Sequence, residues 1–266
     1  MGGRAAGDAW PAAPPADGPG ESVWRAVGRA VESAGERALW VFDADGTLWD
    51  GDLGEVHLDT LADEGLVKAP EGFPSAFAAY RARCELDASE GYAYAASMMG
   101  GMDVATARAS AERAWARHRG YVLAAVRALF DAARSRSEVW IVSASNRFAI
   151  EAAAQELGLA PERVIAMTNG LEGERLLETI RDPRPNGAGK VRCIETFIGR
   201  RPTVAVGNSI HDAEMLDAAE LGVLVRAVDA GGVPEPWPDA LASRAARGGW
   251  LTLDCPLTPR APAIVG

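Results

Sequence analysis

The chain has 266 residues, of which 48% are hydrophobic and 24% are charged, enough for a large domain with a buried core. The formal net charge of −10 argues against nucleic acid or an anionic membrane as the partner. It does not argue against a small phosphorylated substrate, because local cations and a metal ion can override the overall field.

Cysteine usage and apolar runs bear on the cellular setting. Cys84, Cys193 and Cys255 are odd in number and widely spaced, which is typical of reduced thiols in a cytoplasmic protein. No apolar run approaches the roughly 20 residues that span a bilayer. Residues 1–20 are rich in Ala, Gly and Pro without a continuous apolar stretch, so we expect a disordered tail there and no signal peptide.

Short apolar runs separated by helical stretches follow this tail. After a weakly helical segment at 23–37, the runs predict buried strands at 39–42, 139–142, 164–167, 204–206 and 223–225. Apolar residues recur on one face of predicted helices at 122–130, 150–157 and 191–198. Turn residues at 170–173 favour a hairpin, and residues 249–253 favour a last short strand. The alternation predicts an α/β fold with a doubly wound parallel sheet, covered on both faces.

One long segment breaks the alternation. Residues 53–118 are Ala-rich and helical in tendency, and no strand-like run stands out among them. We therefore expect a helical cap at 53–118, inserted into a core formed by residues 21–52 and 119–266.

Polar residues stand where the predicted strands end. In a doubly wound sheet, ligands bind outside the carboxyl ends of the strands. The residues at those ends, together with one lysine at the start of a helix, are Asp43, Asp45, Ser143, Lys190, Asn208 and Asp212. We expect these side chains to meet at one edge of the sheet.

The central pattern is Asp43-Ala44-Asp45-Gly46. Two carboxylates straddle a turn that Gly46 permits: one can attack phosphorus, and the other can protonate the leaving oxygen and then deprotonate water. The backbone N–H groups of the turn, at Ala44 and Gly46, can point at phosphate oxygens. Lys190 at a helix N-terminus is disfavoured by the helix dipole unless an anion such as phosphate binds there.

Four motifs in the right order resemble those of the haloacid dehalogenase (HAD) superfamily. The segment 43–48, Asp-Ala-Asp-Gly-Thr-Leu, resembles motif I, Ser143 motif II and Lys190 motif III. The segment 207–212, Gly-Asn-Ser-Ile-His-Asp, resembles motif IV of the phosphoserine-phosphatase-like branch. The resemblance covers roughly residues 39–226. It implies a Rossmann-like core, and the helical insertion matches the position of a C1-type cap.

The resemblance also implies roles. Asp43 corresponds to the nucleophile, and Asp45 to the general acid–base with its backbone carbonyl as a metal ligand. Ser143 and Lys190 correspond to phosphate-binding residues. The metal-binding residues implied are Asp43, Asp45, Asn208 and Asp212. Mg2+ suits such hard oxygen ligands shared with a substrate phosphate.

Two motif residues bear on the expected reaction and metal affinity, and four residues outside the motifs bear on substrate selection. Dehalogenases lack the second acid, so Asp45 favours phosphate chemistry. Asn208 stands where many relatives carry Asp, which predicts weaker binding of Mg2+. Substrate selection falls to the cap and the loop after motif I, where the candidate residues are Asp52, Glu55, Arg81 and Arg83.

We therefore expect a Mg2+-dependent phosphatase that hydrolyses a small-molecule phosphate monoester through an aspartyl-phosphate. A phosphotransferase or mutase on the same fold stays open, as does a catalytically silent HAD-fold binding module. Neither the physiological substrate nor the oligomeric state follows from these patterns.

Overall fold

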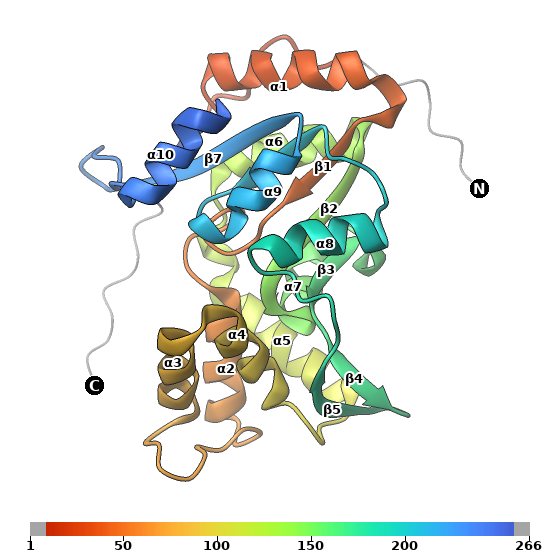
Figure 1. Cartoon of the computed structure of the whole chain (residues 1–266), viewed down its shortest axis with the longest axis vertical. Coiled ribbons are helices and arrows are strands. Elements are labelled where there is room, and N and C mark those ends of the chain that lie inside the picture. The colour runs from red at the N-terminus through yellow and green to blue at the C-terminus, as the bar shows by residue number, and fades with distance from the viewer. Residues whose placement is uncertain (1–8, 258–266) are drawn as a thin grey trace.

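The computed structural model describes residues 9–257, and a six-stranded parallel sheet forms its centre (Figure 1). The strands, in spatial order, are β3 (Val164–Met167), β2 (Glu138–Asn146), β1 (Leu39–Phe42), β6 (Val204–Gly207), β7 (Leu221–Val228) and β8 (Leu251–Pro256). Each of the five predicted buried strands lies within one of these, and β8 overlaps the expected last strand. The predicted α/β, doubly wound fold class is confirmed.

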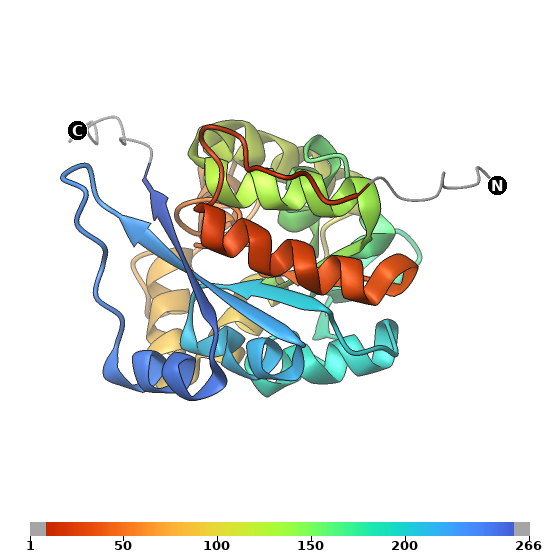
Figure 2. The ribbon, with the colours of Figure 1, turned by 90° about the horizontal axis from the view of Figure 1, so that it is seen from above.

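Helices cover both faces of this sheet (Figure 2). The core helices are α1 (Glu21–Ala34), α6 (Ala124–Arg136), α7 (Arg147–Glu156), α8 (Ala188–Phe197), α9 (Ala213–Ala218) and α10 (Asp239–Gly248). Trp40 and Phe42 of β1 pack in the same cluster as α1, α6 and α7, whereas Val41 packs with α8, α9 and α10. Because successive strand residues face opposite sides, both faces of β1 are buried, and its sequence reads as a continuous apolar run.

The segment at 53–118 is helical, as expected, and lies beyond the carboxyl edge of the sheet (Figure 1). Its helices are α2 (Leu53–Asp63), α3 (Ala76–Leu86), α4 (Ala88–Ser97) and α5 (Val104–His118). Each helix begins after a side chain that accepts a backbone N–H of the first turn; these N-caps are Asp52, Ser75, Asp87 and Asp103. Such caps fix where each helix starts.

A hairpin from outside this segment completes the cap. Strands β4 (Asn169–Glu172) and β5 (Arg175–Ile180) pair antiparallel, apart from the central sheet. The N–H of Leu176 donates to Met102 O at 2.8 Å, and the N–H of Gly101 donates to Leu176 O at 2.7 Å. Leu176 is buried in one apolar cluster with Met99 and other cap residues. The cap therefore combines the predicted helical insertion with a hairpin that follows β3.

The N-terminal segment differs in part from the expected tail. Residues 1–8 lie outside the described residues, but Trp10 is buried and stacks on Trp40, with ring centroids 5.9 Å apart. Gly28 on α1 makes room for Trp10, whose Cδ1 would lie 2.5 Å from a Cβ added there. Trp10 thus anchors this segment to the core, although most residues between 9 and 20 are exposed.

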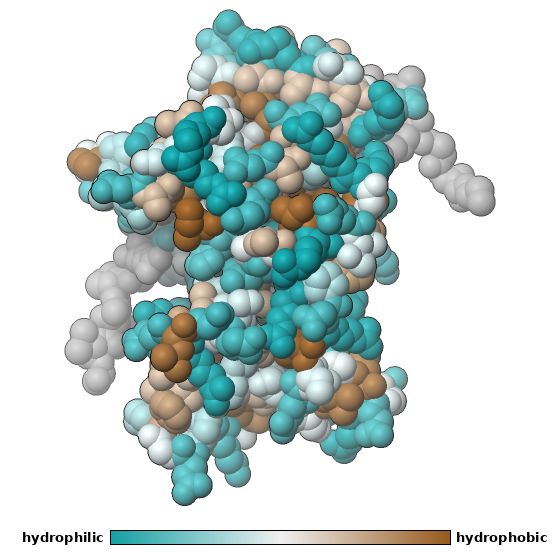
Figure 3. All heavy atoms as spheres, viewed as in Figure 1, coloured by the Kyte–Doolittle hydropathy of each residue, from teal (hydrophilic) through white to brown (hydrophobic). Residues whose placement is uncertain are grey.

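The surface shown in Figure 3 is mostly hydrophilic, and its hydrophobic residues lie scattered over core and cap. Scattered apolar residues of this kind are ordinary on a protein surface. Within residues 9–257, no helix combines the length and apolar character needed to cross a bilayer. All three cysteines are free thiols.

Candidate active site

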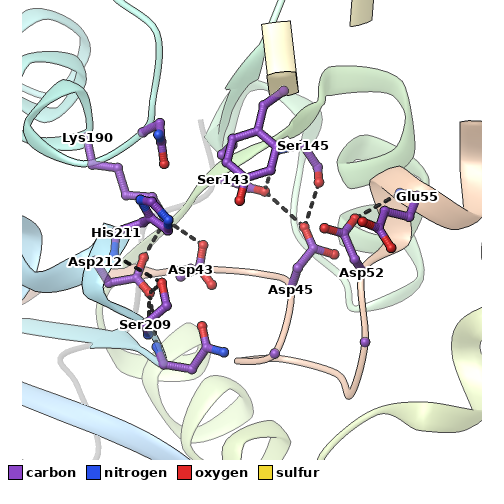
Figure 4. Close-up of a pocket in the computed structure, with 16 residues that line it drawn as sticks. Asp43, Asp45, Asp52, Glu55, Ser143, Ser145, Lys190, Ser209, His211 and Asp212 are labelled. Atoms are coloured by element: carbon purple, nitrogen blue, oxygen red, sulfur yellow. Dashed lines mark hydrogen bonds and ion pairs between the residues drawn. The ribbon is translucent and has the colours of Figure 1, made fainter. Parts of the chain in front are cut away.

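A cavity of about 400 Å3 lies at the carboxyl edge of the sheet, between core and cap (Figure 4). Its lining includes every polar residue predicted at the strand ends: Asp43, Asp45, Ser143, Lys190, Asn208 and Asp212. They come from the ends of β1, β2 and β6 and from the first turn of α8. Parallel strands bring their carboxyl ends to one edge, which is why residues so far apart in sequence meet here.

Lys190 joins two carboxylates at the centre of the site. Its Nζ lies 2.5 Å from Asp43 Oδ1 and 2.6 Å from Asp212 Oδ1. Lys190 is 1% exposed, Asp212 1% and Asp43 6%. A buried charge persists only when it is paired, so these three groups depend on one another.

The charges of the three groups follow from this arrangement. Burial, and then the neighbouring Asp212, raise the pKa of Asp43 to about 7, although Lys190 opposes the shift. Burial alone would lower the pKa of Lys190, but Asp212 and Asp43 hold it above its usual value. Burial alone would raise the pKa of Asp212, but Lys190 and nearby backbone amides hold it below its usual value. Lys190 and Asp212 therefore form a charged ion pair. The protonation state of Asp43 beside them depends on pH near neutrality, because its pKa is about 7.

The second oxygen of Asp212 organises the loop after β6. Asp212 Oδ2 accepts the N–H groups of Asn208 at 3.0 Å and Ser209 at 2.9 Å, and the Ser209 hydroxyl at 3.0 Å. Since Oδ1 faces Lys190, both oxygens have partners within the protein. This arrangement makes Asp212 the anchor of Lys190 and of the loop that carries Asn208.

Asp45 points toward the end of β2 and the start of the cap. Its Oδ1 accepts the Trp49 indole N–H at 2.8 Å and the Leu53 backbone N–H at 2.7 Å. Its Oδ2 accepts the Ser145 hydroxyl at 2.7 Å, and the Ser143 hydroxyl lies 3.4 Å away. Leu53 is the first residue of α2, so this carboxylate bridges core and cap.

Gly46 allows the turn after β1 to close tightly. Its φ is +70°, in the left-handed region, and a Cβ added there would lie 2.1 Å from Asn208 Nδ2. The Thr47 hydroxyl lies 2.9 Å from Asp43 Oδ2 and 3.3 Å from Asn208 Oδ1. The absence of a side chain at Gly46 thus lets the Asn208 amide approach Thr47 and Asp43.

Gly46→Ala tests whether the close approach of Asn208 matters for activity beyond the backbone strain that any residue other than glycine would cause there. We expect a loss of kcat/KM of about a hundredfold, because the added Cβ displaces the Asn208 amide. Gly249→Ala is the matched control, since Gly249 has a φ of +62° and a ψ of +29°, in the left-handed region, but nothing within 4 Å of an added Cβ. It should cost only about 1–2 kcal/mol of stability, with activity retained. Enzyme assays and denaturant unfolding of both variants check this, and equal activity in the two would contradict it.

Of the four predicted substrate residues, two line the cavity and two do not. Asp52 and Glu55 line the cavity, and burial followed by the charge of Asp45 raises the pKa of Asp52 well above its usual value. Arg81 and Arg83 do not line it. Arg81 Nη1 lies 3.6 Å from Glu55 Oε1, and the Arg83 guanidinium lies 3.8 Å from the ring centre of Tyr94.

Several lining residues had no role assigned from the sequence, among them Ser145, Tyr92 and His211. Ser145 could have been found, because alternate residues of a strand face the same side and Ser143 is two residues earlier on β2. Tyr92 on α4 and His211 after β6 lie with ring centroids 6.3 Å apart. No sequence pattern links them, since only the docking of the cap brings α4 over this loop.

The donors present suit a magnesium ion. Among residues 9–257, no group of three His, Cys, Asp or Glu side chains is arranged to hold a metal. The Thr47 hydroxyl, however, lies 2.9 Å from Asp43 Oδ2 and 3.3 Å from Asn208 Oδ1, so a carboxylate oxygen and an amide oxygen flank the same hydroxyl. With the main-chain carbonyl of Asp45 they are hard oxygen donors of the kind Mg2+ takes together with substrate and water.

A parallel sheet that brings paired carboxylates and a buried lysine to one edge, below an inserted cap, defines a Rossmann-like α/β protein with a capped site. The family model of haloacid dehalogenase-like hydrolases matches residues 40–217, well over half of the sequence, and the chain belongs to that family. The predicted HAD membership is confirmed. No curated protein sequence matches the chain.

Solved structures share this fold. A protein of unknown function from Bordetella pertussis Tohama I has a TM-score of 0.64 and 20% identity, over 82% of this chain and 99% of its own. A substrate-bound phosphoserine phosphatase has a TM-score of 0.52 and 15% identity, over 82% of this chain and 92% of its own. Cytosolic 5'-nucleotidase IIIB bound to cytidine has a TM-score of 0.56 and 13% identity, over 88% of this chain and 84% of its own. At these identities the likeness shows a common fold.

Proposed function

We propose that the protein is a Mg2+-dependent phosphatase that hydrolyses a small phosphate monoester through an aspartyl-phosphate on Asp43. The observation that carries this proposal is the Asp43–Lys190–Asp212 arrangement beside Asp45 in one cavity. A carboxylate held by a buried cation is suited to attack phosphorus, and a second carboxylate at the same cavity is suited to move protons.

The proposed reaction has two steps. Ser143, Lys190 and the N–H group of Ala44 hold the phosphate oxygens. The N–H of Gly46, which was also expected to bind phosphate, instead donates to Gly51 O at 3.1 Å. An Asp43 oxygen bonds to phosphorus as the ester P–O bond breaks, and Asp45 gives its proton to the departing oxygen. Water then attacks phosphorus while Asp45 takes its proton, which frees phosphate and restores Asp43.

Bound Mg2+ would neutralise negative charge that develops on the phosphate oxygens. Asp43, the carbonyl of Asp45 and Asn208 are the residues that would hold it. Asp212, which was also expected on the metal side, has both oxygens engaged and supports the site through Lys190. Asp52 and Glu55, which line the cavity, would contact the leaving group, whereas Arg81 and Arg83 lie outside the cavity.

Phosphate release from p-nitrophenyl phosphate, with and without Mg2+, tests the proposal. We expect turnover with Mg2+ and its loss on chelation, followed by selective turnover in a panel of phosphorylated metabolites. Lack of phosphate release from every ester would reject hydrolysis. Phosphoryl transfer to an added alcohol without phosphate release would instead identify a transferase.

Asn208→Asp tests the metal ligands. We expect the apparent affinity for Mg2+ to rise about tenfold, because the substitution turns a neutral oxygen donor into a charged one. Asn186→Asp is the control, since it adds the same charge to the cavity lining from the loop before α8 and not from the loop after β6. Mg2+ titrations of activity and of thermal stability measure the effect. An unchanged affinity in Asn208→Asp, or an equal gain in both variants, would remove Asn208 from the ligand set.

A further inference from the structure

We infer that Ser145 is a positioning residue for Asp45 and orients the one carboxylate oxygen that can carry the transferable proton. The inference rests on the proposed function, in which Asp45 protonates the leaving group. It depends on how the two oxygens of Asp45 are bonded (Figure 4).

Asp45 Oδ1 has no place left for a proton. A carboxylate oxygen offers two lone pairs, and both at Oδ1 face N–H donors. These donors are the Trp49 indole at 2.8 Å and the Leu53 backbone at 2.7 Å. Neither donor can turn into an acceptor, so a proton on Oδ1 would break one of these bonds. The proton of Asp45 must therefore sit on Oδ2.

The Ser145 hydroxyl is the close partner of that oxygen, at 2.7 Å. Ser143 is a weaker partner, because its hydroxyl lies 3.4 Å from Oδ2. In the proposed reaction the single Ser143 O–H turns to the substrate phosphate and is lost to Asp45. Ser145 then occupies one lone pair of Oδ2 and leaves the other position for the proton, which faces the cavity.

Strand geometry and helix capping leave Ser145 available for this role. Asn146, the next residue, caps α7 by accepting the N–H of Ala149 at 3.0 Å, so Ser145 is not needed as the cap. Ser145 is buried, and Gly54 of α2 passes close to it: a Cβ on Gly54 would lie 2.5 Å from Ser145 Oγ. The start of the cap thus confines the hydroxyl against Asp45.

The first chemical step shows what Ser145 should affect. As the Asp43–phosphorus bond forms and the ester bond breaks, the proton on Asp45 Oδ2 moves to the leaving oxygen. A nitrophenolate departs without a proton, whereas a phenolate without the nitro group needs one. A residue that orients the proton should therefore matter more for phenyl phosphate than for p-nitrophenyl phosphate, two esters of similar shape.

Ser145→Ala and Ser145→Cys test this with the full chain and Mg2+ present. The measured quantity is kcat/KM, which reports the steps up to leaving-group departure. We expect kcat/KM for phenyl phosphate to fall about tenfold, because Asp45 loses the hydrogen bond that orients its proton-bearing oxygen. The value for p-nitrophenyl phosphate should change less than about twofold. Ser97→Ala removes a cap hydroxyl that donates to Tyr94 O at 2.8 Å and does not line the cavity, and it should change neither value.

An equal fall for both esters would overturn the inference, because it would place Ser145 in phosphate binding or in general structure. Unchanged values for both would overturn it as well. Cysteine nearly preserves the size of serine but is a weak donor. If Ser145→Cys behaved like the wild type, the effect of Ser145→Ala would come from lost packing and not from the lost hydrogen bond. Lack of phosphate release by the wild type from these two esters and from every phosphorylated metabolite in the panel would reject the proposed function, and this inference with it.

Discussion

Asp43→Asn should reduce turnover by at least about a thousandfold while the protein stays folded. An amide oxygen cannot form the aspartyl-phosphate, and no other carboxylate in the cavity is held by Lys190 and the Thr47 hydroxyl together. Stability should not suffer, because burial and Asp212 already disfavour the charged form of Asp43 and raise its pKa to about 7. We expect the melting temperature of the metal-free variant to equal or exceed that of the wild type.

Phosphate release and thermal unfolding in chelator measure these two effects. Asp17→Asn is the control, since Asp17 is an exposed carboxylate in the turn before α1 that does not line the cavity. It should leave both quantities unchanged. Turnover near the wild-type rate in Asp43→Asn would reject Asp43 as nucleophile. A lowered melting temperature would contradict the electrostatic account of the buried site.

Lys190→Met should damage both stability and activity. The substitution leaves Asp43 and Asp212 buried without their shared cation, and breaking a buried pair in this way costs about 3–5 kcal/mol. Activity should fall at least about a hundredfold, because the site loses a phosphate-binding charge and the anchor of its nucleophile. Denaturant unfolding without metal and phosphate-release assays check the two losses.

A second substitution tests whether the unpaired buried charges cause the stability loss in Lys190→Met. Asp43→Asn in the Lys190→Met background should restore about 1–2 kcal/mol of stability, because one of the two unpaired carboxylates is removed. Activity should not return. Lys68→Met is the control, since Lys68 is exposed and is the only other lysine in the chain. Its unfolding free energy should stay within about 0.5 kcal/mol of the wild type. A double variant no more stable than Lys190→Met would assign the loss to packing.

The strands were predictable because each is buried on both faces. Trp40 and Phe42 face one helical layer and Val41 the other, so β1 appears in the sequence as an unbroken apolar run. Its end at Asp43 was visible for the same reason: the apolar run stops where the chain leaves the sheet. Parallel pairing then carries the last part of β2 and the residue after β6 to the same edge, which is why Ser143 and Asn208 could be placed near Asp43 from sequence alone.

Contacts between elements were much less predictable. Arg81 and Arg83 were candidates for substrate binding because the resemblance assigns substrate selection to the cap, but the packing of α3 turns them to Glu55 and Tyr94. The turn signal at 170–173 marked a hairpin, but nothing local indicated that its Leu176 joins the apolar cluster of the cap. Trp10 lies in a segment whose composition is typical of disorder, yet a gap left by Gly28 accommodates its ring.

The sequence by itself determined the doubly wound core, the helical insertion and the residues that gather at the sheet edge. These depend on periodicity and on strand ends, which are local features. Only the tertiary structure decided that Lys190 lies between Asp43 and Asp212, that Asp45 bonds Ser145 and the start of α2, and that Tyr92 reaches the cavity. Those features depend on distances between residues that are remote in the chain, and packing sets such distances.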